Sequence, residues 1–87
     1  MAVVQISHGD INLLAVRATV ASLPRGTRFR TKAVSGHPTM LAAHAAVASA
    51  RNYHSVVGKM MKANADVVGV RLVGTSRPPD GRLWEHT

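Results

Sequence analysis

The stretch from Ala46 to Met60 decides the fold, and it reads Ala-Val-Ala-Ser-Ala-Arg-Asn-Tyr-His-Ser-Val-Val-Gly-Lys-Met. It predicts the end of one short helix, a tight break and a second short helix. Small Ala46 is followed ten positions later by β-branched Val56 and fourteen positions later by large, apolar Met60. Two helices joined by a short turn can cross at a steep angle when the contact residue on the first is small. Asn52 stands where the second helix should begin, and its side chain can accept a hydrogen bond from the free amide groups there.

Helical spacing of apolar residues predicts three helices in all. The first covers residues 11–23 and follows Asp10, which is a suitable N-cap. The second covers about 39–49 and is rich in alanine, which favours helix and permits close approach of a neighbour. The third covers about 53–63, and Asn64 is expected to end it in the left-handed conformation.

A short strand is expected over residues 27–32, where β-forming residues alternate with Arg28, Arg30 and Lys32. These three basic side chains are candidates for phosphate contact, but a strand between two helices can face away from a duplex. Residues 34–38 are then expected to form a loop, with its proline in the first turn of the next helix.

A β-hairpin is expected at the C-terminal end of the chain. Residues 67–73 are rich in β-branched side chains, residues 74–81 are mostly turn formers, and residues 83–85 provide a return strand. The hairpin tip is basic, since it contains Arg77 and Arg82. The prolines between them stiffen the loop and so lower the entropy lost on placing two arginines in a groove.

Charge and composition indicate a polyanionic partner. Eleven lysines and arginines face four acidic residues, which gives 87 residues a formal net charge of +7. An acidic protein partner, or solubility alone, would explain the same imbalance. The three aromatic residues are scattered, which argues against a surface that stacks single-stranded bases. Without cysteines, a signal peptide or an apolar stretch long enough to span a bilayer, the chain is expected to be cytoplasmic and nucleoid-associated, with no membrane contact.

Catalysis and metal binding have no support in the sequence. The four carboxylates each have a structural explanation as a cap, a turn residue or a strand-surface residue, and no phosphate-cradling glycine loop is present. Five histidines are present, but no pair is spaced for two ligands on one helix face and no cysteine accompanies them. We therefore expect no enzyme activity, no cofactor and no metal.

The predicted order of helix, strand, helix, helix, strand, loop and strand resembles the winged helix-turn-helix family of DNA-binding domains. The resemblance covers about residues 10–85 and implies one α+β domain over 1–87, with three helices, a short strand and a β-hairpin wing. It implies a recognition helix at about 53–63 in the major groove and a wing at about 74–82 on the backbone or minor groove. The expected DNA-binding residues are Asn52, Tyr53, His54, Ser55, Lys59, Lys62, Arg77 and Arg82.

Two departures from the family pattern affect the specific base contacts. Ala50, Arg51 and Asn52 occupy the turn where the family often has a small residue followed by an apolar one, and Gly58 stands where many such helices carry an arginine. Glycine inside a helix costs about 1 kcal/mol relative to alanine. Gly58 therefore indicates either a close approach to another group or a kinked or misplaced helix.

Each candidate contact also has an alternative explanation. Tyr53 could pack its ring against the first helix with its hydroxyl at the surface. Lys59 and Lys62 could belong to an ordinary solvated helix face. Arg77 and Arg82 could sit on a hairpin tip without a ligand, because loops collect exposed charge.

The sequence thus predicts a sequence-specific, duplex DNA-binding regulator of transcription, by analogy a phage or mobile-element repressor, activator or excision factor. One such domain reads few base pairs, so we expect a homodimer or cooperative assembly on paired half-sites, formed through the first helix or residues 2–6. The alternative is a small basic interaction module that docks on an acidic protein partner, such as polymerase or another part of the transcription machinery, a nucleoid protein or a host defence complex. Binding to structured RNA is a weaker alternative.

Overall fold

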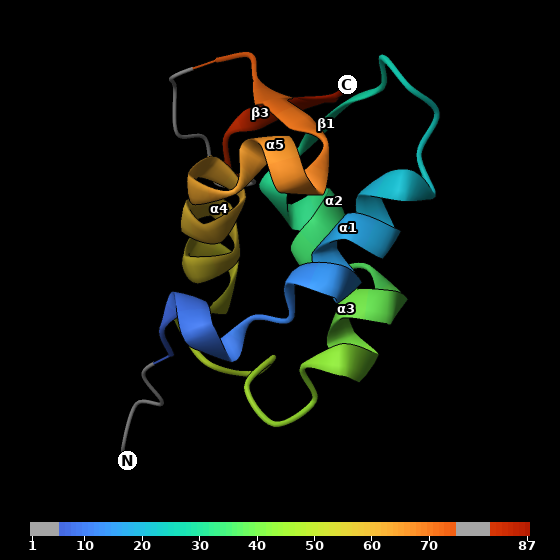
Figure 1. Cartoon of the computed structure of the whole chain (residues 1–87). Helices are drawn as coiled ribbons and strands as arrows, with labels where there is room; N and C mark the ends of the chain where they lie inside the picture. The colour runs from blue at the N-terminus through green and yellow to red at the C-terminus, as the bar shows by residue number, and fades with distance from the viewer. Residues whose placement is uncertain (1–5, 75–80) are drawn as a thin grey trace.

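The computed structural model describes residues 6–74 and 81–87, which form an α+β domain with five α-helices and a three-stranded antiparallel sheet (Figure 1). In chain order the elements are a short 3-10 helix η1 (His8–Asp10), α1 (Leu13–Ala21), β1 (Arg28–Arg30), α2 (Thr31–Ser35), α3 (Pro38–Ala43), α4 (Tyr53–Ala63), α5 (Ala65–Val68), β2 (Val70–Leu72) and β3 (Leu83–His86). No helix within these residues is long and apolar enough to cross a membrane.

The sheet lies at one end of the helices, with strand order β1-β3-β2 (Figure 1). Trp84 of the central strand pairs with Phe29 on one side and with Leu72 on the other. Phe29 and Trp84 are buried. Because alternate residues of a strand point to opposite faces, this row turns toward the helices and the neighbouring row turns toward solvent. The predicted pairing of a C-terminal return strand with the preceding strand is confirmed. The preceding strand is shorter than the predicted 67–73, because Ala65–Val68 form α5 and the strand begins only at Val70.

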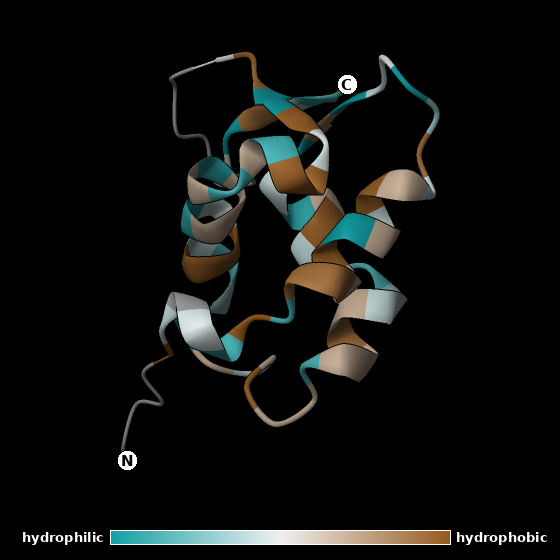
Figure 2. Cartoon of the chain, viewed as in Figure 1, coloured by the Kyte–Doolittle hydropathy of each residue, from teal (hydrophilic) through white to brown (hydrophobic). Residues whose placement is uncertain are grey.

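The hydrophobic core gathers between α1, α2, α4 and the inner face of the sheet. Its largest fully buried side chains are Trp84, Tyr53, Met40 and Met61. Hydrophobic and hydrophilic residues alternate along α4 (Figure 2), as an amphipathic helix on a core requires. The predicted bounds of α4 are confirmed, and Val56 and Met60 are buried on it as expected.

The first helix is shorter than predicted, and its cap is a different residue. It begins at Leu13, and the Asn12 side chain accepts hydrogen bonds from the backbone amides of Leu14 and Ala15. Asp10 instead lies in η1 and accepts from the amide of Ser7. The prediction that Asp10 caps this helix is therefore wrong.

The alanine-rich helix predicted over 39–49 exists only in its first part, because α3 ends at Ala43 and the chain continues in turns to residue 52. His44 ends it. This side chain is buried, and its Nε2 accepts from the backbone amide of Asn12 at 2.7 Å. Ala46 lies exposed in the turns, so it is not the small contact residue that packs against Val56 and Met60.

Two further local predictions need correction. Residues 31–35 form α2, so the expected strand is only three residues long and the expected loop over 34–38 begins as helix. Asn64 has φ −126° and is not left-handed; its side-chain amide donates to the Met60 carbonyl instead. The left-handed residue is Gly69, at φ 85° after α5. The expectation that Pro38 occupies the first turn of its helix is confirmed.

Candidate nucleic-acid interface

The exposed side of α4 carries four of the predicted contact residues. Five buried residues hold its other side to the core. The exposed four are His54, Ser55, Lys59 and Lys62. Residues four apart lie on one side of a helix, so His54 and Lys62 share a row with Gly58 between them. This face is polar, carries two lysines and contains no carboxylate.

Tyr53 and Asn52 do not belong to this face, which corrects two predicted contacts. Tyr53 is fully buried, and its hydroxyl lies 3.4 Å from the Met40 carbonyl and 3.2 Å from Nδ1 of His44. Burial raises the pKa of this tyrosine above its ordinary value of 10.0. Asn52 makes no capping hydrogen bond; its amide donates to the Ile6 carbonyl at 3.4 Å. Both side chains therefore hold the start of α4 to the rest of the fold.

His54 connects α4 to α2. Its Nδ1 meets the hydroxyl of Ser35, a fully buried residue. Partial burial of the ring lowers the pKa of His54 below its ordinary value of 6.5, and the positive charge of Lys32 lowers this pKa further. A neutral ring can accept the Ser35 hydroxyl proton through Nδ1, whereas a protonated ring cannot.

The lowered pKa of His54 predicts a pH dependence of stability. The folded chain holds this proton less tightly than the unfolded chain does. The stability contributed by neutral His54 is therefore fully present above pH 6.5 and is lost as the pH falls below that value. Replacing His54 with Gln, which keeps an acceptor for Ser35, should reduce the loss of unfolding free energy between about pH 7.5 and about pH 5.5. Urea titrations at the two pH values measure it, and an equal loss in both proteins would contradict it.

Thr31 at the start of α2 lies where α4, α2 and the base of the hairpin meet. A Cβ atom placed on Gly58 would lie 3.4 Å from Cγ2 of Thr31, so α4 passes α2 in direct contact at this glycine. A Cβ atom placed on Gly81 would lie 2.5 Å from Cβ of Thr31. The Thr31 hydroxyl accepts from the indole Nε1 of Trp84 at 2.9 Å. Gly58 thus marks a close approach of two helices, which is one of the two alternatives that the sequence leaves open.

The same junction holds the backbone of Arg82 and the side chain of Arg30 at the base of the hairpin. The Thr31 amide donates to the carbonyl of Arg82 at 3.2 Å, and Nη1 of Arg30 lies 3.5 Å from the Gly81 carbonyl. Both arginines are half-buried. α2 runs past α4 with Ser35 near His54 and Thr31 near Gly58, so Lys62, one turn further, lies toward the hairpin base. The predicted contact Arg77 lies outside the described residues.

No protein-family model, curated protein or solved structure matches this chain. The candidate interface is therefore defined by its own geometry: the exposed side of α4, the start of α2 and the base of the hairpin.

The sequence underrates one basic residue of this interface, Lys32. It favours the hairpin tip over Lys32, because a strand between helices can face away from DNA. In the structure residues 31–35 form α2, and the positive charge of Lys32 acts on His54 of α4. The strand pattern of the sequence therefore carries no signal for Lys32.

Proposed function

We propose that this chain binds duplex DNA as a winged helix-turn-helix domain and regulates transcription in the cytoplasm. The observation that carries the proposal is the junction at Thr31, which joins the exposed side of α4 to the base of a β-hairpin. A recognition helix beside a hairpin is the arrangement with which such domains contact a groove and the neighbouring backbone. The sheet order β1-β3-β2 also fits this architecture, because β1, which precedes α2, α3 and α4, pairs with the return strand β3.

Each exposed polar residue of α4 has a role in the proposed complex. Lys59 and Lys62 contact phosphates, since an ammonium group is a flexible point charge. Ser55 and His54 lie in the first turn of α4, the end that usually reaches base edges. With its lowered pKa, His54 acts there as a neutral hydrogen-bonding group rather than as a cation. Sequence is read by such edge contacts, whereas the lysines position the protein.

Replacing both α4 lysines should weaken duplex binding uniformly across sequences. We expect Lys59→Gln/Lys62→Gln to reduce the slope of log affinity against log salt by about 1.8, because each phosphate that the protein neutralises contributes about 0.9 to this slope. The measurement is fluorescence anisotropy with a labelled duplex over a salt series.

The matched control is Arg17→Gln/Arg25→Gln, which removes the same charge from two exposed residues of α1 and the turn after it, on the side of the molecule away from α4 (Figure 1). This control should leave the slope nearly unchanged. Equal losses of slope in the two variants would mean that binding depends on the net charge of the protein and not on the exposed side of α4. No duplex binding by the parent chain at physiological salt would reject the proposal and favour an acidic protein partner.

Pairing of two copies on adjacent half-sites is part of the proposal. The proposed contact lies on α1, where Leu14 has 73 % of its surface exposed.

A further inference from the structure

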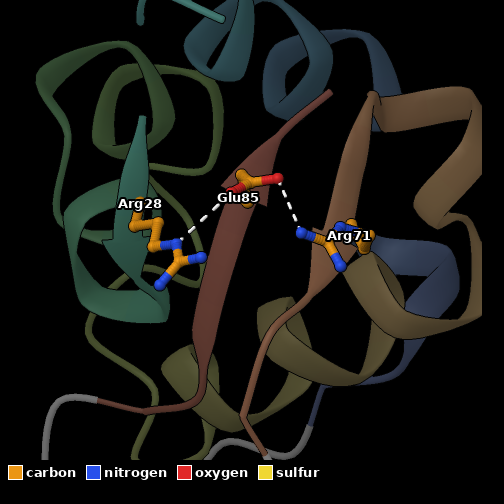
Figure 3. Close-up of polar contacts among 3 residues, drawn as sticks. All are labelled: Arg28, Arg71 and Glu85. Carbon is orange, nitrogen blue, oxygen red and sulfur yellow. Dashed lines mark hydrogen bonds and ion pairs between the residues drawn. The ribbon is translucent and has the colours of Figure 1, made fainter. Parts of the chain in front are cut away.

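The outer face of the sheet carries a row of charges across its three strands. Glu85 of the central strand is opposite Arg28 of β1 and Arg71 of β2. Its Oε2 accepts from Nε of Arg28 at 3.3 Å, and its Oε1 accepts from Nη2 of Arg71 at 2.8 Å (Figure 3). Arg30, two residues after Arg28, lies on the same side of β1. We call these four residues the outer sheet face.

The outer sheet face carries more positive charge than its single carboxylate, Glu85, can neutralise. Hydrogen bonds from Arg71 and, to a smaller extent, from Arg28 lower the pKa of Glu85 below its ordinary value of 4.5. This carboxylate is therefore ionised at neutral pH. One negative charge then stands among three positive charges. A second guanidinium on a carboxylate that is already paired adds little stability, because exposed ion pairs are weak and the two arginines repel each other.

The two paired arginines remain able to bind an anion. Their side chains are 59 % and 60 % exposed, whereas Glu85 between them is 21 % exposed. The ion pair uses one N–H of each guanidinium, and each guanidinium has five.

We propose that the outer sheet face binds the phosphate backbone of a second duplex segment, so that one chain bridges two duplexes. This inference rests on the proposed function, in which α4 occupies the first duplex. The sheet lies at the top of the molecule and α4 along its left side (Figure 1). Because DNA has a persistence length of about 150 bp, a short duplex on α4 stays straight and does not fold over onto the sheet.

Capture of a second duplex tests the inference. The full chain is bound to a short duplex fixed on beads, and retention of a free, labelled duplex is measured at physiological salt. Arg28→Gln/Arg71→Gln removes both positive charges and leaves shorter side chains with an amide donor, and it should reduce capture about tenfold, as expected when two phosphates are no longer neutralised. The same variant should bind a single duplex with little change. Glu85→Gln, which removes the competing carboxylate, should increase capture.

Other outcomes separate the two proposals. If the parent chain binds no duplex, both fail. If it binds one duplex but captures no second, or if Arg17→Gln/Arg25→Gln reduces capture as much as Arg28→Gln/Arg71→Gln, only the bridging inference fails. Bridging that survives the replacement of Arg28 and Arg71 would come from self-association of two DNA-bound copies and would also overturn it. Thermal unfolding of each variant confirms that the sheet is intact before capture is compared.

Discussion

Replacing Trp84 with alanine is expected to destabilise the fold by about 3–5 kcal/mol, the range for removing a buried tryptophan. Trp84 is fully buried in the central strand, and its neighbours across the sheet are Phe29 and Leu72. Its indole Nε1 also donates to the hydroxyl of Thr31. A domain of 87 residues has a total stability of about 4–13 kcal/mol, so this one change removes a large part of it.

Urea unfolding followed by circular dichroism measures the effect, because the variant lacks the only tryptophan of the chain. Trp84→Phe is the matched comparison. It keeps an aromatic ring on the core and removes the indole N–H, so it should cost less than the alanine variant, about 1–3 kcal/mol. A loss below about 1 kcal/mol for Trp84→Ala would show that β3 does not anchor the sheet to the helices.

The parts of the fold that the sequence can predict are those with a local signal. Helix α4 has apolar residues at helical spacing, and its predicted bounds agree with the observed ones. The return strand is predictable from its residue types and from the turn formers before it. Each signal lies within one segment, so no distant contact is needed to find it.

The second predicted helix fails because alanine alone does not fix where a helix ends. Intrinsic propensity favours helix throughout 39–49, but only Met40 and the buried ring of His44 anchor the first part of that segment to the core. The His44 ring accepts from Asn12, a residue far away in the chain. This tertiary contact outweighs the propensity of the alanines that follow, and no pattern within the segment encodes it.

The candidate site likewise contains residues that a local signal predicts and residues whose position depends on distant contacts. His54, Ser55, Lys59 and Lys62 follow from helical spacing, and all four are exposed. The sequence groups Tyr53 with them because it begins the same helix, yet its burial depends on contacts with α3 and the turn after it. The junction at Thr31 has no signal in the sequence, since it joins residues from α2, α4 and the hairpin.

Replacing Gly81 with alanine should be the most damaging single-methyl change in the chain. Gly81 has φ 91°, a conformation that costs an L residue about 1–2 kcal/mol. The added methyl would also lie 2.5 Å from Cβ and 2.7 Å from Oγ1 of Thr31, so the hairpin base or α2 would have to move. Overpacking of this kind costs a further ~1–3 kcal/mol, and the expected total is about 2–5 kcal/mol.

Gly26→Ala separates the two contributions to the loss at Gly81. Gly26 has a nearly identical φ of 84°, but nothing lies within 4 Å of the position its Cβ would occupy. This control should therefore show the backbone cost alone, about 1–2 kcal/mol. The difference in unfolding free energy between the two variants measures the contact with Thr31. Equal losses would mean that the hairpin base shifts away from α2 freely. In that case the hairpin would not be held at a fixed distance from α4, and the proposed DNA interface would lack the geometry on which it depends.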